Sequence, residues 1–310
     1  MSDGAERVLV YDTFVREGIL YIISNYYFPR DAPVVITVNG TRASEHGFNE
    51  YEQCRYFTVP MSDLSGSPTI LSINGTEHPL VAPLVEPRAR GLAIATLFKH
   101  DHPFLSNMIR YYKSLGVEDF YLYYNGDTLP EGLPTGEGIH YGLWNYTYYN
   151  HREWNRVADL GYFHNAQMTF LTMMRCKYLS DHSWMGFIDL DEYIVCSERS
   201  SLLDALNKTQ SDAVCIPHHW ASLDKMIVTY SAEPLEFGKR SKMFYKGAYK
   251  GLIGVHTPKR GTYHKAKTLK LLHIQNFNHM ERLGELKPPL CTVSLDGFHD
   301  VGSLFRSHPW

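Results

Sequence analysis

Several features that would place this 310-residue chain in a special class are missing from its sequence. No apolar run approaches the roughly 18 residues of a membrane-spanning helix, and Met1 to Glu6 is too polar to open a signal peptide. The net charge of −3 gives no field that would attract nucleic acid. With 44% hydrophobic and 20% charged residues, the sequence predicts a soluble globular protein in the cytoplasm.

Cysteine is also scarce. The five cysteines are odd in number, widely spaced and without a Cys-x-x-Cys pair, so they indicate neither a zinc cluster nor a disulfide framework. We expect reduced thiols in the core. No internal repeat with a period of 20 to 50 residues stands out either, which excludes the common repeat architectures.

The first part of the chain is rich in short β-type runs. Examples are Ile19 to Ile23, Val34 to Val38, Tyr56 to Val59 and Thr69 to Ile73. Turn residues separate these runs. Two of the turns are Asn-Gly-Thr, at Asn39 and Asn74; each is a glycosylation sequon, but Asn-Gly is also a hairpin signal, and we favour the turn. The spacing predicts a small antiparallel β-sandwich over residues 1 to 88, ending in a proline-rich linker from Pro79 to Pro87.

Beyond Arg90 the pattern alternates strand with helix. Leu92 to Phe98 reads as a buried strand, Pro103 opens an amphipathic helix that Gly116 closes, and Val117 to Tyr124 is the next strand. A longer helix is expected from about residue 154 to residue 179, and Ser201 begins a capping box for another. This order predicts a second domain, residues 89 to 310, of the α/β class with a mostly parallel sheet flanked by helices.

The most informative segment is the run from Gly186 to Ile194, in which an apolar strand ends in Asp189, Asp191 and Glu192. Open α/β sheets bind ligands at the carboxyl ends of their strands. Side chains alternate along a strand, so Asp189 and Asp191 point to one side if the strand runs on regularly through them. Two carboxylates suit Mg²⁺ or Mn²⁺, which complete their coordination with water and phosphate oxygens, so the pattern predicts a metal-bound diphosphate.

A third metal ligand would complete such a site. His256 and His273 follow the acid run in the chain and are the candidates, with a structural role for each as the alternative. Ligation by imidazole would favour Mn²⁺ over Mg²⁺.

Several segments together resemble one family. The strand Ala95 to Lys99, the segment Leu115 to Asn125, the run His164-Asn165-Ala166-Gln167, Cys176 and the acid block occur in the order found in glycosyltransferase family 92. This resemblance implies the GT-A fold, a Rossmann-like architecture. The chain departs from the family after its first strand, where it has Lys99-His100-Asp101-His102, and in the segment His218 to Leu223. We therefore expect a remote branch, such as those carried by large DNA viruses.

The resemblance implies an enzyme that uses a nucleotide sugar. We expect a metal-dependent, inverting transfer from a UDP-sugar, a pentose or hexose such as xylose or galactose, to a hydroxyl of a glycan acceptor. The residues expected to contact the nucleotide lie near the ends of the predicted strands or in a glycine-rich basic turn: Thr96, Lys99, Asn125, Asp127, Asp189 and Lys250. Turn formation is the alternative role for Asn125 and Asp127, and a solvated turn for Lys250.

Inversion also requires a general base on the acceptor hydroxyl. Several acids are available, and the sequence does not choose among them. We favour Asp224, which follows Trp220, with Glu192 as a second candidate. Two other classes stay open: a non-catalytic carbohydrate-binding protein, and a metal-dependent phosphodiesterase or hydrolase.

Overall fold

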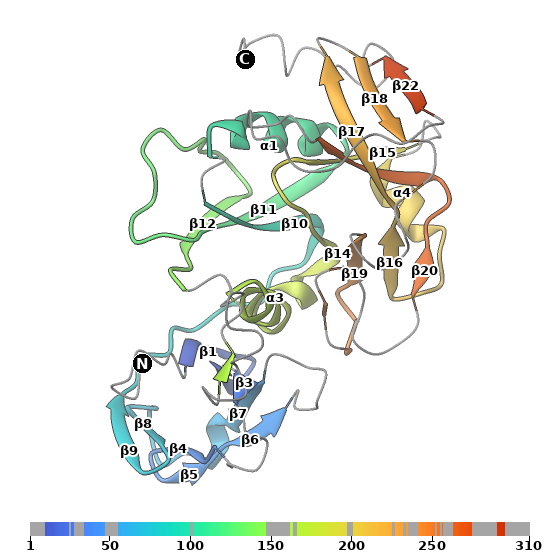
Figure 1. Cartoon of the computed structure of the whole chain (residues 1–310). Coiled ribbons are helices and arrows are strands. Elements are labelled where there is room, and N and C mark those ends of the chain that lie inside the picture. The colour runs from blue at the N-terminus through green and yellow to red at the C-terminus, as the bar shows by residue number, and fades with distance from the viewer. Residues whose placement is uncertain are drawn as a thin grey trace. The chain divides into compact units, whose positions relative to one another are not determined.

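The computed structural model describes residues 10–24, 26–27, 34–46, 55–99, 102–146, 162–163, 166–196, 201–224, 227–231, 234, 241–251, 253–254, 256, 263–274 and 290–294. The chain divides into two compact units. Unit 1 comprises Met1–Ala89, Tyr146–Asp181 and Leu252–Gly254, and unit 2 comprises Arg90–Asn145, His182–Gly251 and Val255–Trp310. The described elements are α/β, with mixed sheets and few helices (Figure 1).

Unit 1 contains two four-stranded antiparallel sheets near the N-terminus. One has the order β1-β2-β7-β6, formed by Val10–Arg16, Ile19–Ser24, Tyr56–Pro60 and Ser44–His46. The other has the order β5-β4-β8-β9, formed by Thr41–Arg42, Ile36–Val38, Ile70–Ile73 and Thr76–Pro79. Both sheets contribute to one hydrophobic core, which includes Leu20, Ile22, Ile36, Val38, Phe57 and Leu71.

The two Asn-Gly pairs form the expected hairpin turns. Asn39 and Gly40 link β4 to β5 with φ of 47° and 82°, and Asn74 and Gly75 link β8 to β9 with φ of 50° and 87°. Positive φ at both central residues is what a type I′ turn requires. The proline-rich segment is not a free connection, because the Val15 backbone bonds to Pro83 and Val85 at 2.9 and 2.8 Å.

Helix α3 (Ala166–Lys177) also belongs to unit 1, where it contacts β1 and β2. The helix predicted from about residue 154 to residue 179 is thus confirmed from Ala166, but Tyr162–Phe163 form a strand and not a helix, and residues 151–161 lie outside the described part. The 3-10 turn η4 (Leu179–Asp181) follows α3, as η1 (Met61–Asp63) follows β7. Asp181 forms a buried ion pair with Arg16 at 2.7 Å. A two-stranded pairing joins β3 (Tyr26–Tyr27) to β13 (Tyr162–Phe163).

Unit 2 is built on a seven-stranded sheet of order β12-β11-β10-β14-β19-β16-β20. Its first four strands, Ile139–Leu143, Val117–Tyr124, Arg90–Phe98 and His182–Phe187, are mutually parallel. Strand β19 (Lys242–Lys246) is antiparallel to both β14 and β16 (Ala213–Ile216), and β20 (His264–Lys265) is parallel to β16. Six of the seven strands of this sheet therefore run in one direction and β19 runs against them, so the sheet is mixed but mostly parallel, as predicted.

Helix α1 (Leu105–Ser114) joins β10 to β11 after the 3-10 turn η2 (His102–Phe104). Its apolar stripe is buried in the core of unit 2, as the sequence predicted, and Gly116 ends it with φ of 89°. Helix α4 (Leu202–Asn207) begins at the predicted cap, where the Ser201 side chain accepts a hydrogen bond from Asp204 N at 3.1 Å.

A second sheet in unit 2 has five strands in the order β15-β21-β17-β18-β22. They are Glu192–Cys196, Leu269–Ile274, His218–Asp224, Ile227–Ser231 and Leu290–Ser294. Strand β15 directly follows the turn of residues 188–191 at the end of β14, which carries Asp189 and Asp191 and is called the acid turn below. The chain thereby passes from one sheet to the other at the acids.

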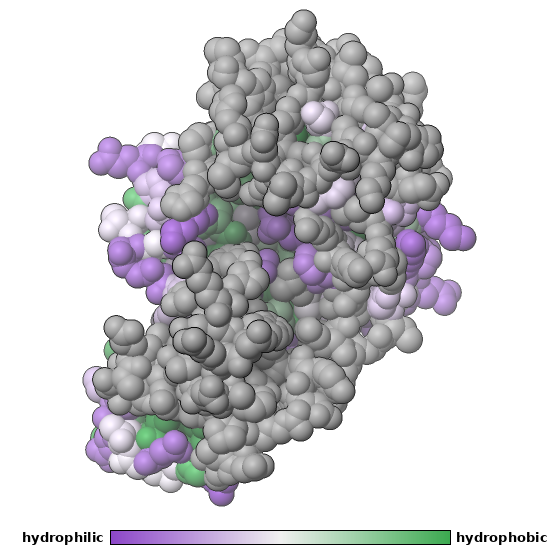
Figure 2. Space-filling model, viewed as in Figure 1, coloured by the Kyte–Doolittle hydropathy of each residue, from purple (hydrophilic) through white to green (hydrophobic). Residues whose placement is uncertain are grey.

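Figure 2 shows hydrophilic side chains along the outer margins of the described surface. A few large hydrophobic side chains are exposed as well: Val35, Ile70, Val81, Leu84 and Leu143. Within the described residues, none of the helices is both long enough and apolar enough to span a membrane.

Candidate metal centre

A tight turn carries the chain from β14 to β15 at the carboxyl end of the parallel strands. Because β14 ends at Phe187, Asp189 and Asp191 lie in this turn and not on the regular strand that was expected to point them to one side. Ile188 N donates to Ala95 O at 3.3 Å, which prolongs the pairing with β10, and Glu192 N donates to Asp189 O at 3.2 Å. The buried hydroxyl of Thr96 donates to Ile188 O at 2.8 Å. These hydrogen bonds to β10 fix the backbone of the turn.

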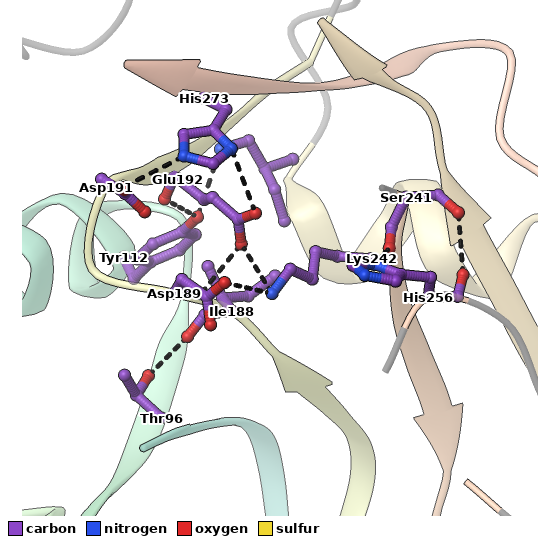
Figure 3. A network of polar contacts seen from close by, with 11 residues as sticks. Thr96, Tyr112, Ile188, Asp189, Asp191, Glu192, Ser241, Lys242, His256 and His273 are labelled. Carbon is purple, nitrogen blue, oxygen red and sulfur yellow. Dashed lines mark hydrogen bonds and ion pairs between the residues drawn. The ribbon is translucent and has the colours of Figure 1, made fainter. Parts of the chain in front are cut away.

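Glu192 lies at the centre of a buried polar network (Figure 3). Its Oε2 accepts from Asp189 N at 2.9 Å and lies 3.3 Å from Lys242 Nζ. Lys242 is also buried and contacts Asp189 Oδ2 at 2.5 Å. Burial raises the pKa of Glu192 to about 7, although the charge of Lys242 opposes this shift. The ammonium thus compensates two acids in a region of low dielectric.

Asp191 pairs with His273, which the β15–β21 register places directly opposite Glu192. Asp191 Oδ2 lies 3.0 Å from His273 Nε2, and both side chains are almost completely buried. Burial by itself would lower the pKa of His273, but the hydrogen bond to Asp191 and the surrounding carboxylates outweigh burial and raise it. The acid run and the predicted histidine therefore meet in one site.

Two further aromatic side chains surround His273. The rings of His218 and Trp220, both on β17, lie 4.9 and 4.8 Å from the His273 ring, measured between centroids. Glu192, His218 and His273 each present one ligand atom within 4.8 Å of the others. Two imidazoles and a carboxylate fit a divalent transition metal.

Two tyrosines of α1 form hydrogen bonds with the backbone of β15, next to the acid turn. Tyr112 Oη donates to Glu192 O at 2.8 Å and accepts from Ile194 N at 3.2 Å. Tyr111 Oη donates to Ile194 O at 2.5 Å. These hydroxyls bond the edge of β15 that faces away from β21, so α1 fixes the backbone that carries Asp191 and Glu192.

The residues predicted to contact the nucleotide differ in their burial and in their hydrogen-bond partners. Thr96 is buried and uses its hydroxyl within the fold, whereas Lys99 is exposed just after β10. Asn125, after β11, is buried and donates from Nδ2 to Trp144 O at 2.7 Å. The exposed Asp127 accepts from Asn145 Nδ2. The Asn125 side chain thus links the ends of β11 and β12. Strands β10, β11 and β14 all end at this edge of the sheet.

Three other predicted residues fall outside the cluster or cannot be placed in it. His256 Nδ1 bonds to Ser241 O at 3.0 Å, and Figure 3 shows it on the far side of Lys242 from His273. Lys250 is exposed and follows β19, whose antiparallel register with β14 carries it away from the acids. Asp224 ends β17, and its side chain lies outside the described part of the chain.

His218 and Lys242 were not predicted as site residues. His218 stands beside Trp220 in a segment that departs from the resembled family, and that departure is the signal that could have drawn attention to it. Lys242 follows a basic stretch that reads as a solvated loop. No local pattern marks it as a buried cation.

These features define the class of the protein. It contains an α/β unit with a candidate metal centre at the carboxyl edge of its sheet. No family model matches the chain. It is 26% identical over 121 residues to a glycosyltransferase family 92 protein of Oryza sativa subsp. japonica, a match covering 38% of this chain and 18% of the relative. It is 28% identical over 156 residues to one of Ricinus communis, covering 45% and 25% respectively.

The chain therefore spans a quarter or less of the length of these curated relatives. Among solved structures, the mannosyltransferase Ktr4p of S. cerevisiae is matched with a TM-score of 0.27 and 12% identity, over 42% of this chain and 39% of that one. Both sequence matches are to proteins of glycosyltransferase family 92.

Proposed function

We propose that the protein is a metal-dependent, inverting glycosyltransferase that moves a sugar from a UDP-sugar to a hydroxyl of a glycan acceptor. One observation carries the proposal: Asp191 and His273 lie 3.0 Å apart, next to Asp189, at the carboxyl edge of the parallel strands. This edge is where open α/β sheets bind nucleotides. The similarity to family 92 proteins supports the same class.

In this proposal, a metal ion bound at the acid turn stabilises the leaving group. Breaking the bond between the anomeric carbon and the diphosphate leaves extra negative charge on the nucleoside diphosphate, and a bound divalent cation supplies charge stabilisation there. Mn²⁺ suits the mixture of carboxylate and imidazole better than Mg²⁺. Asp189, partly exposed, is available for ribose or the metal, and Lys99 for the diphosphate.

The acceptor side requires a base. In a single displacement the acceptor oxygen attacks the anomeric carbon while a carboxylate takes its proton. Glu192 is buried and bonded on several sides, which favours a holding role for it. Asp224 at the end of β17 is the base that we propose, because β17 also carries Trp220, which lies against the site.

A panel of UDP-pentoses and UDP-hexoses, incubated with Mn²⁺ and analysed for UDP release, tests the function. We expect release with at least one donor, its loss in EDTA, and its loss in Asp191→Asn. Asp212→Asn is the matched control, since Asp212 is an exposed acid of the same unit. UDP release that persists in EDTA would contradict metal dependence. Sugar binding with no release would favour a non-catalytic carbohydrate-binding protein, and cleavage of simple phosphodiesters would favour a hydrolase.

A further inference from the structure

The sheet β1-β2-β7-β6 of unit 1 has two different faces. One face, with Leu20, Ile22 and Phe57 among its residues, belongs to the hydrophobic core of the unit. Side chains alternate along a strand, so the residues between these lie on the opposite face. There Tyr21 of β2 and Tyr56 of β7 are half-buried. The outer face of an antiparallel sheet is usually polar, so aromatic side chains on this one indicate a second role for it.

Four rings form one row across this outer face. Phe14 of β1 stacks on Tyr21 with ring centroids 5.1 Å apart and an interplanar angle of 10°. Tyr21 and Tyr56 are 6.4 Å apart at 26°, and Tyr56 and His46 of β6 are 4.9 Å apart at 18°. The strand register explains the row, because Phe14 is paired with Tyr21 and Tyr56 with His46. The four rings are called the aromatic row below.

The inner end of the aromatic row is buried and fixed by α3. This helix contacts β1 and β2, which lie at that end of the sheet. Phe14 is fully buried, and Lys177 Nζ lies 5.0 Å from the centre of its ring while it pairs with Asp12 at 2.9 Å. The Arg175 guanidinium lies 5.7 Å from the centre of the Tyr56 ring. The row therefore has a rigid support, which a preorganised binding surface requires.

The outer end of the aromatic row lies on the edge strand β6, where His46 is half-buried. One face of its ring stacks on Tyr56, and no other ring of the described residues stacks on the opposite face. A hydrogen bond of 2.7 Å between His46 Nε2 and Thr58 Oγ1 holds the ring in place. Burial and the charge of Arg175 lower the pKa of His46 from its ordinary value of 6.5, so the ring is neutral at pH 7. The row thus ends in a fixed, neutral ring.

A sugar ring fits the chemistry of this surface. A pyranose has a face of apolar C–H groups that packs on an aromatic ring, and hydroxyls around it that bond to polar groups. The Tyr21 and Tyr56 hydroxyls and the Arg175 guanidinium border the row and can bond to such hydroxyls. Single-stranded nucleic acid also stacks on aromatic rings, but it requires a strongly basic groove, and the net charge of this chain is −3.

We propose that the aromatic row of unit 1 binds an oligosaccharide, with one sugar ring stacked on His46 and further contacts to Tyr56 and Tyr21. Its role in sugar transfer rests on the proposed function: the oligosaccharide is then the acceptor, which unit 1 holds on the same chain that carries the acid turn. Such tethering raises the effective concentration of the acceptor. Binding of the oligosaccharide by itself does not depend on transfer.

Calorimetric titration of the full chain with xylohexaose, mannohexaose and a galacturonic acid hexamer, in the absence of nucleotide, tests the site. We expect at least one of the three to bind. Tyr56→Leu and His46→Gln should each weaken that binding by about 10-fold, the loss of one aromatic contact, whereas Tyr56→Phe should keep most of it because the stack persists. His78→Gln is the control, since His78 is a half-buried histidine of β9, in the other sheet of unit 1.

A wild-type chain that binds none of the three oligosaccharides overturns the site. A folded His46→Gln that binds as the wild type does overturns it as well. If the variants do not fold, hydrogen–deuterium exchange of the wild type decides the question: protection of β6 and β7 by the bound oligosaccharide supports the site, and unchanged exchange in both strands refutes it.

The outcomes also separate this site from the proposed function. UDP release from a donor without acceptor should be the same in His46→Gln as in the wild type, because the aromatic row does not contribute to the donor site. Oligosaccharide binding without UDP release from any donor would leave the row standing and remove the proposed function. UDP release without oligosaccharide binding would remove the row and leave the proposed function.

Discussion

Lys242 Nζ lies 2.5 Å from Asp189 Oδ2, so one acid of the Asp-x-Asp pair already has a buried cation as its partner. The Asp189 side chain is 42% exposed, whereas the Lys242 side chain is only 3% exposed. The lysine therefore holds Asp189 from the interior and leaves the outer face of that carboxylate open to ribose or phosphate.

Replacing this lysine should destabilise the fold. In Lys242→Met the buried Glu192 loses its cation, and breaking a buried pair costs about 3–5 kcal/mol; because Asp189 is partly hydrated, we expect the lower end. Urea denaturation measures the change. Lys246→Met is the control, since its ion pair with Asp212 at 3.6 Å is partly exposed and should contribute less than about 1 kcal/mol. Equal stability of the two variants would contradict the assigned role of Lys242.

The Tyr112 hydroxyl should matter for both stability and activity. In Tyr112→Phe, Ile194 N and Glu192 O lose a buried partner, and an unsatisfied buried group costs about 1–3 kcal/mol. Because this hydroxyl fixes the backbone of the acid turn, we also expect weaker metal binding. Tyr141→Phe is the comparison, since its hydroxyl bonds to Pro134 O in a partly exposed setting. Unchanged metal affinity in Tyr112→Phe would show that the turn keeps its shape without α1.

Acid stability should depend on Asp119 and His140, away from the acid turn. Burial would raise the pKa of Asp119, but the hydrogen bond with His140 at 2.8 Å and the charge of Arg90 outweigh burial and lower it below 3.8. A lowered folded-state pKa gives stability that is complete above the ordinary pKa and is lost as pH falls through the folded one.

His140→Gln should therefore move acid unfolding to higher pH, as followed by circular dichroism between about pH 2 and pH 6. His264→Gln, at an exposed histidine, provides the reference. An acid transition that is the same in both variants would mean that the pair with Asp119 contributes no acid stability.

The stereochemistry of transfer is a further test of the proposed function. A retaining double displacement needs a carboxylate nucleophile beneath the sugar, whereas inversion needs only a base near the acceptor. We expect an α-linked UDP-sugar to give a β-linked product, seen directly in the proton NMR spectrum. Retention would refute the single displacement. Full activity in Asp224→Ala would remove that residue as the base and leave inversion intact.

The sequence predicts best what depends on local patterns. Strand β11 matches its predicted bounds, the Ser201 cap starts α4, and both Asn-Gly turns form, because each depends on a few neighbouring residues. The position of Asp189 and Asp191 at a strand end was predictable for the same reason. His273 was chosen from the sequence as a candidate third ligand, and its contact with Asp191 puts it near the acids, but ligation of a metal by either residue stays a prediction.

The rest of the site depends on strand register between distant segments. His218 reaches His273 only through the parallel pairing of β17 with β21, and Lys242 reaches Asp189 because β19 runs antiparallel to β14. An antiparallel strand in the middle of an α/β sheet reverses which of its ends lies near the acids. For that reason Lys242 belongs to the site and Lys250 does not.

The discontinuity of unit 1 bears on the order in which the chain folds during synthesis. The two N-terminal sheets are complete once residue 79 has emerged, but α3, which contacts β1 and β2, is made some 90 residues later, after β10, β11 and β12 of unit 2. The apolar face of β1 and β2 therefore stays uncovered by α3 while part of unit 2 is being translated. The nascent chain should accordingly show its highest demand for chaperones between the emergence of residue 89 and that of residue 181.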